Sequence, residues 1–253
     1  MSDLIQLDVV DRVALLTLHD PERANTISRT LNAGLMEALD GLEARDDVGA
    51  VVVTGAGRAF CAGADLDDLA ACRDEETLRG IYAGFLRLAD FPLPTVAAVN
   101  GAAVGAGLNM ALACDVILAG ESARFDTRFL QIGLHPGGGN TWRLRCLTDL
   151  QATMALVVFG EVVDGRRAAE IGLAWRCVAD DELVAAARAL AGRAAAAPPE
   201  LVRRMRATVQ ATDGVTTSAQ AVDLELGPQL WSFEQPAFAE LLERQRRRMR
   251  EGR

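Results

Sequence analysis

The sequence predicts an α/β fold with a helical C-terminal extension. Short apolar and β-branched runs alternate with amphipathic helical stretches over about the first 195 residues, as in a sheet covered by helices. From Asp181 onward the pattern is entirely helical. Half of the 253 residues are hydrophobic, which is enough to bury a large core. We therefore expect a core domain over residues 1–195 and a helical region over residues 196–253.

The first predicted elements are two paired strands, a capped helix, a buried strand and a long helical region, at 5–10, 13–18, 28–42, 50–54 and 66–88. Asp11 and Arg12 separate the first two strands and form the turn of an antiparallel pair. Ser28 is placed to cap a helix that carries leucines at helical spacing. Pro92 and Pro94 end the helical region.

The central stretch, 95–115, is predicted to be a buried strand that turns directly into a buried helix. The strand, 95–99, gives way to Asn100 and Gly101, and small residues at apolar spacing follow. The N–H groups at the start of such a helix have no partner within the helix. Because glycine and alanine wall this turn, a ligand can approach it closely, and the site suits an oxyanion or a phosphate.

The remaining predicted elements alternate until the helical extension begins, and we expect strands at 116–119, 123–125 and 175–178. The strand at 123–125 is expected to extend the same sheet layer. A glycine run at 137–139 enters a helix, an apolar helix follows at 151–159, and Gly172 closes a short helix. Beyond Asp181, Pro198 and Pro199 are predicted to stop one helix before two further ones.

Charge and composition exclude several function classes. A net charge of −9 argues against a nucleic-acid or anionic-membrane surface. All 26 basic residues are arginine, so neither Schiff-base chemistry nor a Walker lysine is available. The sequence lacks HExxH and GxSxG, and we expect no metal. Phe60 takes the third glycine's place in GxGxxG, which argues against a dinucleotide site.

The cysteines and the chain start predict a cytoplasmic protein. Five scattered cysteines without a CxxC pair are typical of reduced thiols. The first residues fit no signal or transit peptide. The run 91–114 carries no charge, but its prolines, glycines and asparagines are expected to suit a buried strand and turn rather than a membrane span.

Several motifs together resemble the enoyl-CoA hydratase/isomerase (crotonase) family. They are AFCAGADL at 59–66, VAAVNGAAVGAGLNMALACD at 96–115 and the spaced IGL, PGGG and RL of 132–144. PERAN at 21–25 and AAEIGLAWRCV at 168–178 extend the similarity over nearly the whole chain. The resemblance implies a crotonase-like spiral of ββα units, with a C-terminal α-helical region that supports homotrimers, often paired into hexamers.

The resemblance also implies an acyl-CoA thioester as ligand, with coenzyme A as part of the substrate and no separate cofactor. Two backbone N–H groups, those of Ala64 and Ala106, would polarise the thioester carbonyl. The family more often has glycine where Ala106 stands, but alanine suits the negative φ of a helix start. Further substrate contacts implied by these motifs and by neighbouring loops are Arg23, Arg58, Ala62, Gly63, Asp65, Leu66, Gly105 and Phe129. Asp65 is also placed to cap a helix.

The sequence departs from the family where its hydratases activate water. Two glutamates do this in the family, and the matching places hold Asn109 and Phe129. Neither side chain exchanges a proton usefully, and a positioned acid or base contributes about 10²- to 10⁴-fold to rate. We therefore expect a protein that binds acyl-CoA without being an efficient enoyl-CoA hydratase, whatever its place in fatty acid metabolism.

Substitute groups are few, and each has a structural alternative. His135 is an acid or base, or a turn histidine that bonds to backbone. Asp126 and Arg128 supply a base or hold a substrate carboxylate, or they belong to a solvated loop. Asn109 donates a hydrogen bond to an enolate or water, or it is satisfied within its helix. Cys61, next to the first loop, is expected to be a core thiol.

Three functions stay open at this point. The first is an enzyme that stabilises an acyl-CoA enolate, such as an isomerase, a decarboxylase or a hydrolase. The second is a catalytically silent homologue that binds acyl-CoA. The third is a hydratase, a lyase, with rewired proton donors. Asn109 and Phe129 stand where the family has its two glutamates. Whether the chain is an enzyme therefore depends on whether other groups supply the proton transfer that those glutamates perform.

Overall fold

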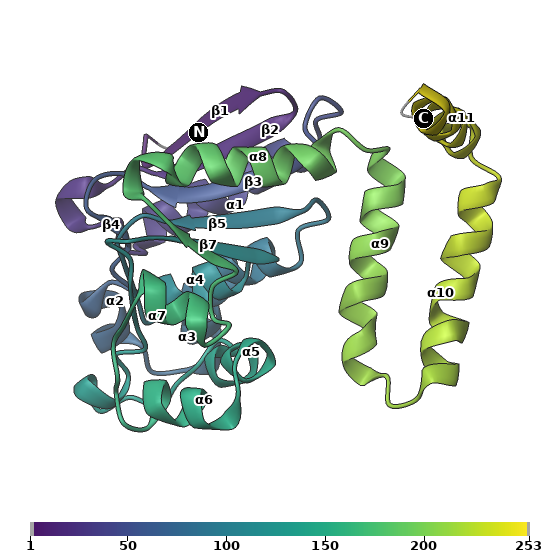
Figure 1. Ribbon diagram of the computed structural model, residues 1–253. Helices are drawn as coiled ribbons and strands as arrows, with labels where there is room; N and C mark the ends of the chain where they lie inside the picture. Colours follow the sequence, from purple (N-terminus) through teal and green to yellow (C-terminus); the bar gives the residue numbers. More distant parts are fainter. Residues whose placement is uncertain (1–2, 252–253) are drawn as a thin grey trace. The chain divides into compact units, whose positions relative to one another are not determined.

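The computed structural model describes residues 3–251, which fall into two compact units. The first unit ends at Ala195 and the second begins at Ala196. The first is a mixed α/β unit (Figure 1). The second is helical.

The strands of the first unit form two sheets. The larger has the order β1-β2-β3-β5-β7-β10, with β1 (Ile5–Val10), β2 (Val13–Leu18), β3 (Ala50–Gly55), β5 (Thr95–Val99), β7 (Val116–Gly120) and β10 (Arg176–Val178). The smaller has the order β4-β6-β8-β9, with β4 (Ala59–Cys61), β6 (Ala102–Val104), β8 (Arg124–Asp126) and β9 (Val163–Asp164). The hairpin of β1 and β2 is antiparallel, as predicted, and β2, β3, β5, β7 and β10 pair in parallel.

The helices of the first unit are α1 (Arg29–Glu43), α2 (Leu66–Ala71), α3 (Glu75–Ala89), α4 (Ala106–Leu112), α5 (Asn140–Leu147), α6 (Leu150–Val157), α7 (Gly165–Glu170) and α8 (Leu183–Ala195). Single 3₁₀ turns lie at Pro21–Arg23, Leu130–Ile132 and Asp180–Glu182. The predicted Ser28 cap is confirmed, because its side chain accepts a hydrogen bond from the N–H of Leu31.

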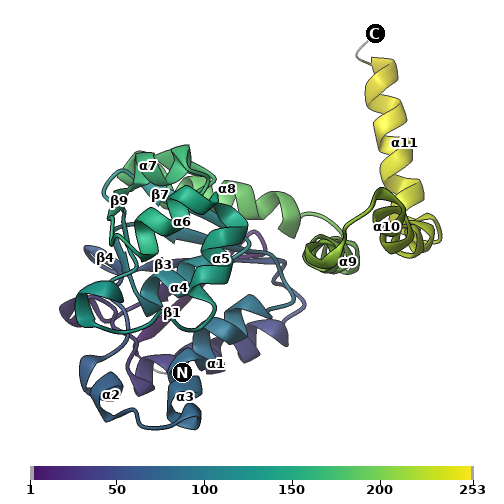
Figure 2. The same cartoon turned by 90° about the horizontal axis from the view of Figure 1, so that it is seen from below.

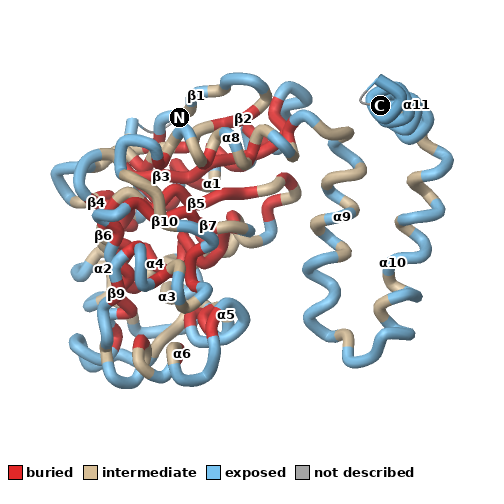
Figure 3. Tube along the Cα trace, viewed as in Figure 1, coloured by how far each residue is buried: buried red, intermediate tan, exposed pale blue. Residues whose placement is uncertain are grey.

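The central strands of the larger sheet, β3 and β5, are buried on both faces, which explains their continuous apolar sequences. In β3, Val51 and Val53 join a core with α1 and α3, while Ala50 and Val52 pack toward α8 on the other face. Figure 3 shows the resulting band of buried residues along the strands. The sheet therefore provides a rigid base for the loops at its strand ends.

Four expectations about local structure were wrong. A short strand, β6, stands between β5 and α4, so the central strand does not turn directly into a helix. The segment expected to extend the same sheet, β8, pairs with β6 in the smaller sheet. The helical region 66–88 is broken into α2 and α3, because Asp74 caps a new helix there. The chain after α8 forms α9, α10 and α11 rather than two helices.

The second unit consists of α9 (Pro199–Ala211), α10 (Ser218–Phe233) and α11 (Pro236–Glu251), with a 3₁₀ turn at Thr212–Gly214. Pro199 opens α9, where its missing N–H has no consequence. Figure 2 shows α9 and α10 nearly end-on. They pack together, with the Arg204 guanidinium 4.2 Å from the centre of the Trp231 ring. Within the described part of α9, α10 and α11, no residue is buried, and several large apolar side chains are exposed.

The uncharged run 91–114 forms β5, β6 and α4, which lie in the core of the first unit. Across residues 3–251, no helix has both the length and the apolar character needed to span a bilayer.

Candidate active site

The loop after β4, residues 62–65, is held by backbone hydrogen bonds to the preceding segment 24–27. They run from the N–H of Ala62 to the Ala24 oxygen (3.0 Å), from Ile27 to Gly63 (2.8 Å) and from Asp65 to Ile27 (3.1 Å). These bonds surround Ala64 on both sides, so its own N–H is fixed in place.

Asn25 ties this segment to the strand before the loop. The side chain is fully buried, and its Nδ2 donates to the carbonyl oxygens of Ala56 (2.9 Å) and Ala59 (2.8 Å). Its Oδ1 accepts from the N–H of Asp20 (2.9 Å). Asn25 has a φ of +56°, which asparagine tolerates better than most residues. The asparagine of PERAN is therefore a brace for the first loop, a role that the sequence analysis did not assign.

The second loop joins β6 to α4 and lies directly against the first. A Cβ added to Gly107 would lie 2.1 Å from the Cys61 carbonyl oxygen, so α4 packs on β4 with no room for a side chain. Gly63 has a φ of +105°, and a Cβ there would lie 3.9 Å from the nitrogen of Ala106. The backbones that carry Ala64 and Ala106 are therefore close neighbours.

Ala64 and Ala106 line the same cavity, which has a volume of about 370 Å³. No described residue accepts a hydrogen bond from either N–H group. Much of the remaining wall is apolar and includes Leu66, Leu69, Leu78, Ile81, Phe129 and Ile132. A cavity with two available backbone donors and an apolar wall suits a carbonyl compound with a hydrocarbon chain.

The cavity brings together most of the predicted site residues. Its lining includes Ala62, Gly63, Ala64, Leu66, Gly105, Ala106, Asn109, Phe129 and His135. The structure places the other four outside the lining: Arg23, Arg58, Asp65 and Asp126.

Asn109 is held in a buried amide network. Its Nδ2 donates to the Gly137 carbonyl oxygen (3.0 Å), and its Oδ1 accepts from Nδ2 of Asn140 (2.8 Å). Asn109 and Asn140 are each 1% exposed. Nδ2 has a second N–H beyond the one that bonds to Gly137, and Oδ1 has a second lone pair beyond the one that accepts from Asn140. The alternative that this side chain is satisfied within its own helix is wrong, since both partners come from the segment 137–140.

Asp126 and Arg128 form an ion pair at the edge of the cavity. The Asp126 carboxylate is buried and accepts from Nε and the N–H of Arg128, both at 2.8 Å. Arg128 lines the cavity, with a φ of +60°. Asp126 is therefore not part of a solvated loop. Each of its two carboxylate oxygens already accepts a hydrogen bond from Arg128.

His135 is exposed and belongs to the cavity lining. Its Nδ1 lies 2.8 Å from the carbonyl oxygen of Pro136. That contact makes Nδ1 the donor, and no described residue bonds to Nε2. The side chain thus has the backbone bond of a turn histidine and also one ring nitrogen available to a ligand.

Asp65 and Cys61 support the first loop. The Asp65 side chain caps α2 and also pairs with Arg23. Hydrogen bonds from the N–H groups at the start of α2 hold the pKa of Asp65 below its ordinary value, and Arg23 adds to this. Burial raises the pKa of the Cys61 thiol to about 12, so it stays protonated and is no nucleophile.

Tyr82 of α3 is a cavity residue that the sequence analysis missed. Its ring packs on Phe85, with the ring centres 5.5 Å apart. Burial raises the pKa of its hydroxyl group. The signal was present in the sequence, since Tyr82 is the single tyrosine and shares a helix face with Leu78 and Phe85.

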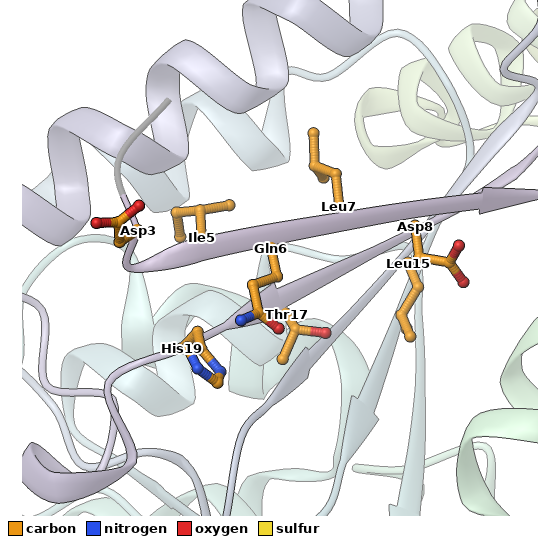
Figure 4. Close-up of a pocket in the computed structure, with 8 residues that line it drawn as sticks. All are labelled: Asp3, Ile5, Gln6, Leu7, Asp8, Leu15, Thr17 and His19. Carbon is orange, nitrogen blue, oxygen red and sulfur yellow. The ribbon is translucent and has the colours of Figure 1, made fainter.

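A second hollow, of about 770 Å³, lies on the hairpin of β1 and β2. Figure 4 shows Ile5 and Leu7 projecting from one side of β1, with Gln6, Thr17 and His19 on the other. This hollow contains no residue of the two loops. We therefore assign the candidate site to the cavity between the loops.

Comparison with known proteins gives a consistent result. Residues 9–240 match the family described as enoyl-CoA hydratase/isomerase. The chain is 47% identical to "Probable enoyl-CoA hydratase EchA14" of Mycobacterium tuberculosis, over 94% of this chain and 95% of that protein. It is 34% identical to the 1,2-epoxyphenylacetyl-CoA isomerase of Escherichia coli, over 89% and 88%. The crystal structure of an enoyl-CoA hydratase from Bacillus anthracis superposes with a TM-score of 0.91 at 27% identity, covering 97% of each chain.

Proposed function

Since this chain belongs to the enoyl-CoA hydratase/isomerase (crotonase) family, we propose that it binds an acyl-CoA whose thioester oxygen accepts hydrogen bonds from the N–H groups of Ala64 and Ala106. One observation carries the proposal. Both N–H groups belong to residues lining one cavity, and no described residue uses them. Donors fixed in this way stabilise the negative charge of an enolate as it develops.

The remaining walls fit the rest of such a ligand. The apolar side chains around Leu66, Leu78 and Phe129 would surround the acyl chain. Arg23, in the 3₁₀ turn Pro21–Arg23, and Arg58, between β3 and β4, lie outside this lining, and we propose them as partners of the coenzyme A phosphates. Coenzyme A enters as part of the substrate in this scheme.

For the reaction, we propose enolate chemistry other than efficient hydration. No aspartate or glutamate is among the described residues that line the cavity, and Asn109 is committed to Gly137 and Asn140. Isomerisation rearranges bonds within the acyl group and consumes no water, and one relative is named as an isomerase. Decarboxylation and hydrolysis would draw on the same two donors. His135, through Nε2, is the cavity side chain that we propose as acid or base.

A second candidate is a silent homologue that binds acyl-CoA without turnover. The absence of a carboxylate among the described lining residues favours it. The third candidate is a hydratase with rewired proton donors. The name of the mycobacterial relative, a probable enoyl-CoA hydratase, supports keeping this candidate.

We also propose that the chain assembles as a homotrimer or a dimer of trimers. The second unit exposes large apolar side chains, including Met205, Val209 and Leu230, that a subunit contact would cover. The free cysteines support a cytoplasmic location.

The variant Ala106→Pro tests the central contact. Proline at the first position of a helix is tolerated, so this change removes the donor N–H of α4 and keeps the helix. Glu75→Pro makes the same change at the first position of α3 and is the matched control. Calorimetric titration with butanoyl-CoA and assays with short and long 2-enoyl-CoAs would be run on all three proteins.

We expect Ala106→Pro to bind butanoyl-CoA about tenfold more weakly than the wild-type protein, and any turnover to fall about 10²-fold or more. Glu75→Pro should match the wild-type protein. Unchanged binding and turnover in Ala106→Pro would refute the proposal. Tight binding without any product would select the silent homologue, and rapid hydration would select the hydratase.

A further inference from the structure

The hydroxyl group of Tyr82 occupies a defined place in the cavity wall. A Cβ added to Gly137 would lie 2.2 Å from the Tyr82 hydroxyl oxygen, so that oxygen rests directly on the backbone of residue 137. The ring is tilted by 44° against Phe85, which is fully buried. Packing on a buried ring and on a backbone glycine fixes the position of the hydroxyl oxygen.

This hydroxyl group has no protein partner among residues 3–251, although it lies in a largely apolar wall. Tyr82 lines the cavity, and its oxygen is not among the fully buried polar atoms that lack a hydrogen bond, so this oxygen is accessible. Its neighbours on α3 are Leu78 and Ile81. A polar group in such a wall is available to the ligand.

The protonation state of Tyr82 makes it a donor. Burial raises the pKa of the phenol. The group therefore keeps its proton at neutral pH and presents an O–H. Asn109 bonds to the carbonyl of the same Gly137, so the phenol and the amide flank one backbone segment.

We propose that the Tyr82 O–H donates a hydrogen bond to an oxygen atom carried by the acyl chain beyond the thioester carbonyl. The thioester oxygen itself is assigned to Ala64 and Ala106, so a third donor needs a second oxygen in the ligand. The site then selects oxygenated acyl groups over plain hydrocarbon ones, because a plain chain leaves the phenol without a partner. This inference rests on the proposed binding of acyl-CoA.

The test compares butanoyl-CoA with 2-hydroxy-, 3-hydroxy- and 4-hydroxybutanoyl-CoA in calorimetric titrations of the full chain. Tyr82→Phe removes only the hydroxyl group and keeps the ring on Phe85. We expect the wild-type protein to bind at least one hydroxylated ligand about three- to tenfold more tightly than butanoyl-CoA. In Tyr82→Phe the ratio of the two affinities should fall to about one.

A merely structural role of Tyr82 would leave this ratio unchanged, because it would shift both affinities together. The inference is overturned if the wild-type protein shows no preference, or if Tyr82→Phe keeps it. Thermal unfolding of Tyr82→Phe checks that the variant is folded, and Tyr82→Leu repeats the test with a different apolar side chain. Failure of the wild-type protein to bind any of the four ligands would instead refute the proposed function.

Discussion

The brace formed by Asn25 offers a strong test of how the site is held together. Asn25→Ala removes two short donated hydrogen bonds, to Ala56 and Ala59, a longer one to Phe60 (3.3 Å), and one accepted from Asp20. At about 1 kcal/mol each, the two short donated bonds and the accepted one contribute about 3 kcal/mol. Alanine in the left-handed region at φ +56° adds about 1 kcal/mol. We expect a loss of about 4 kcal/mol from the free energy of unfolding, a large part of the 5–15 kcal/mol typical of proteins.

Urea unfolding followed by circular dichroism measures this loss, and titration with butanoyl-CoA below the unfolding transition measures its effect on the site. Binding should weaken as well, because Asn25 holds the segment that positions Ala64. The control lies one residue earlier. Ala24 has a φ of +52°, and Ala24→Gly should relieve strain, leaving stability unchanged or raised by up to about 1 kcal/mol. A loss below 1 kcal/mol in Asn25→Ala would refute the brace.

Two further predictions concern proton chemistry and pH. The double variant Asn109→Glu with Phe129→Glu should gain hydration of crotonyl-CoA, since Asn140 offers Nδ2 to a new carboxylate at 109. No gain in a folded double variant would mean that the cavity is shaped for other chemistry. Asp65 has its pKa lowered in the folded state, so it stabilises the fold above its unfolded pKa, near 3.8, and this contribution is lost as pH falls through the folded value. Asp65→Ala should therefore be less stable than the wild-type protein at pH 7 by urea unfolding, with the difference shrinking toward pH 2. A difference that is constant with pH would contradict this.

Elements with strong local signals were predictable from the sequence. The hairpin of β1 and β2, the Ser28 cap and the buried β3 follow from alternation, capping chemistry and an apolar run. The strand β6 was missed because three residues of alanine and valine carry no pattern that separates a strand from a helix. Its pairing with β4 and β8, contacts distant in sequence, decides its conformation.

Backbone motifs in the sequence predicted which residues line the candidate cavity, but nothing in the sequence predicted the partners of its side chains. Ala64 and Ala106 were found through two glycine-rich loops, and both line the cavity. One partner of the Asn109 side chain, Asn140, lies 31 residues further along the chain. Arg128 has a positive φ, and its side chain donates a hydrogen bond to the Asp126 carboxylate. Such contacts depend on the folded path of the chain, so periodicity does not reveal them.

The close contact between α4 and β4 means that backbone packing positions the N–H groups of the cavity independently of the side chains that line it. The position of the Ala64 and Ala106 donors is set by backbone packing at Gly63 and Gly107, with no catalytic side chain involved. The side chains proposed for proton chemistry, such as His135, belong to other segments of the cavity wall. Substitutions of wall side chains can therefore alter the chemistry of the cavity and leave these two backbone N–H groups in place; relatives of this chain are named both as a probable hydratase and as an isomerase.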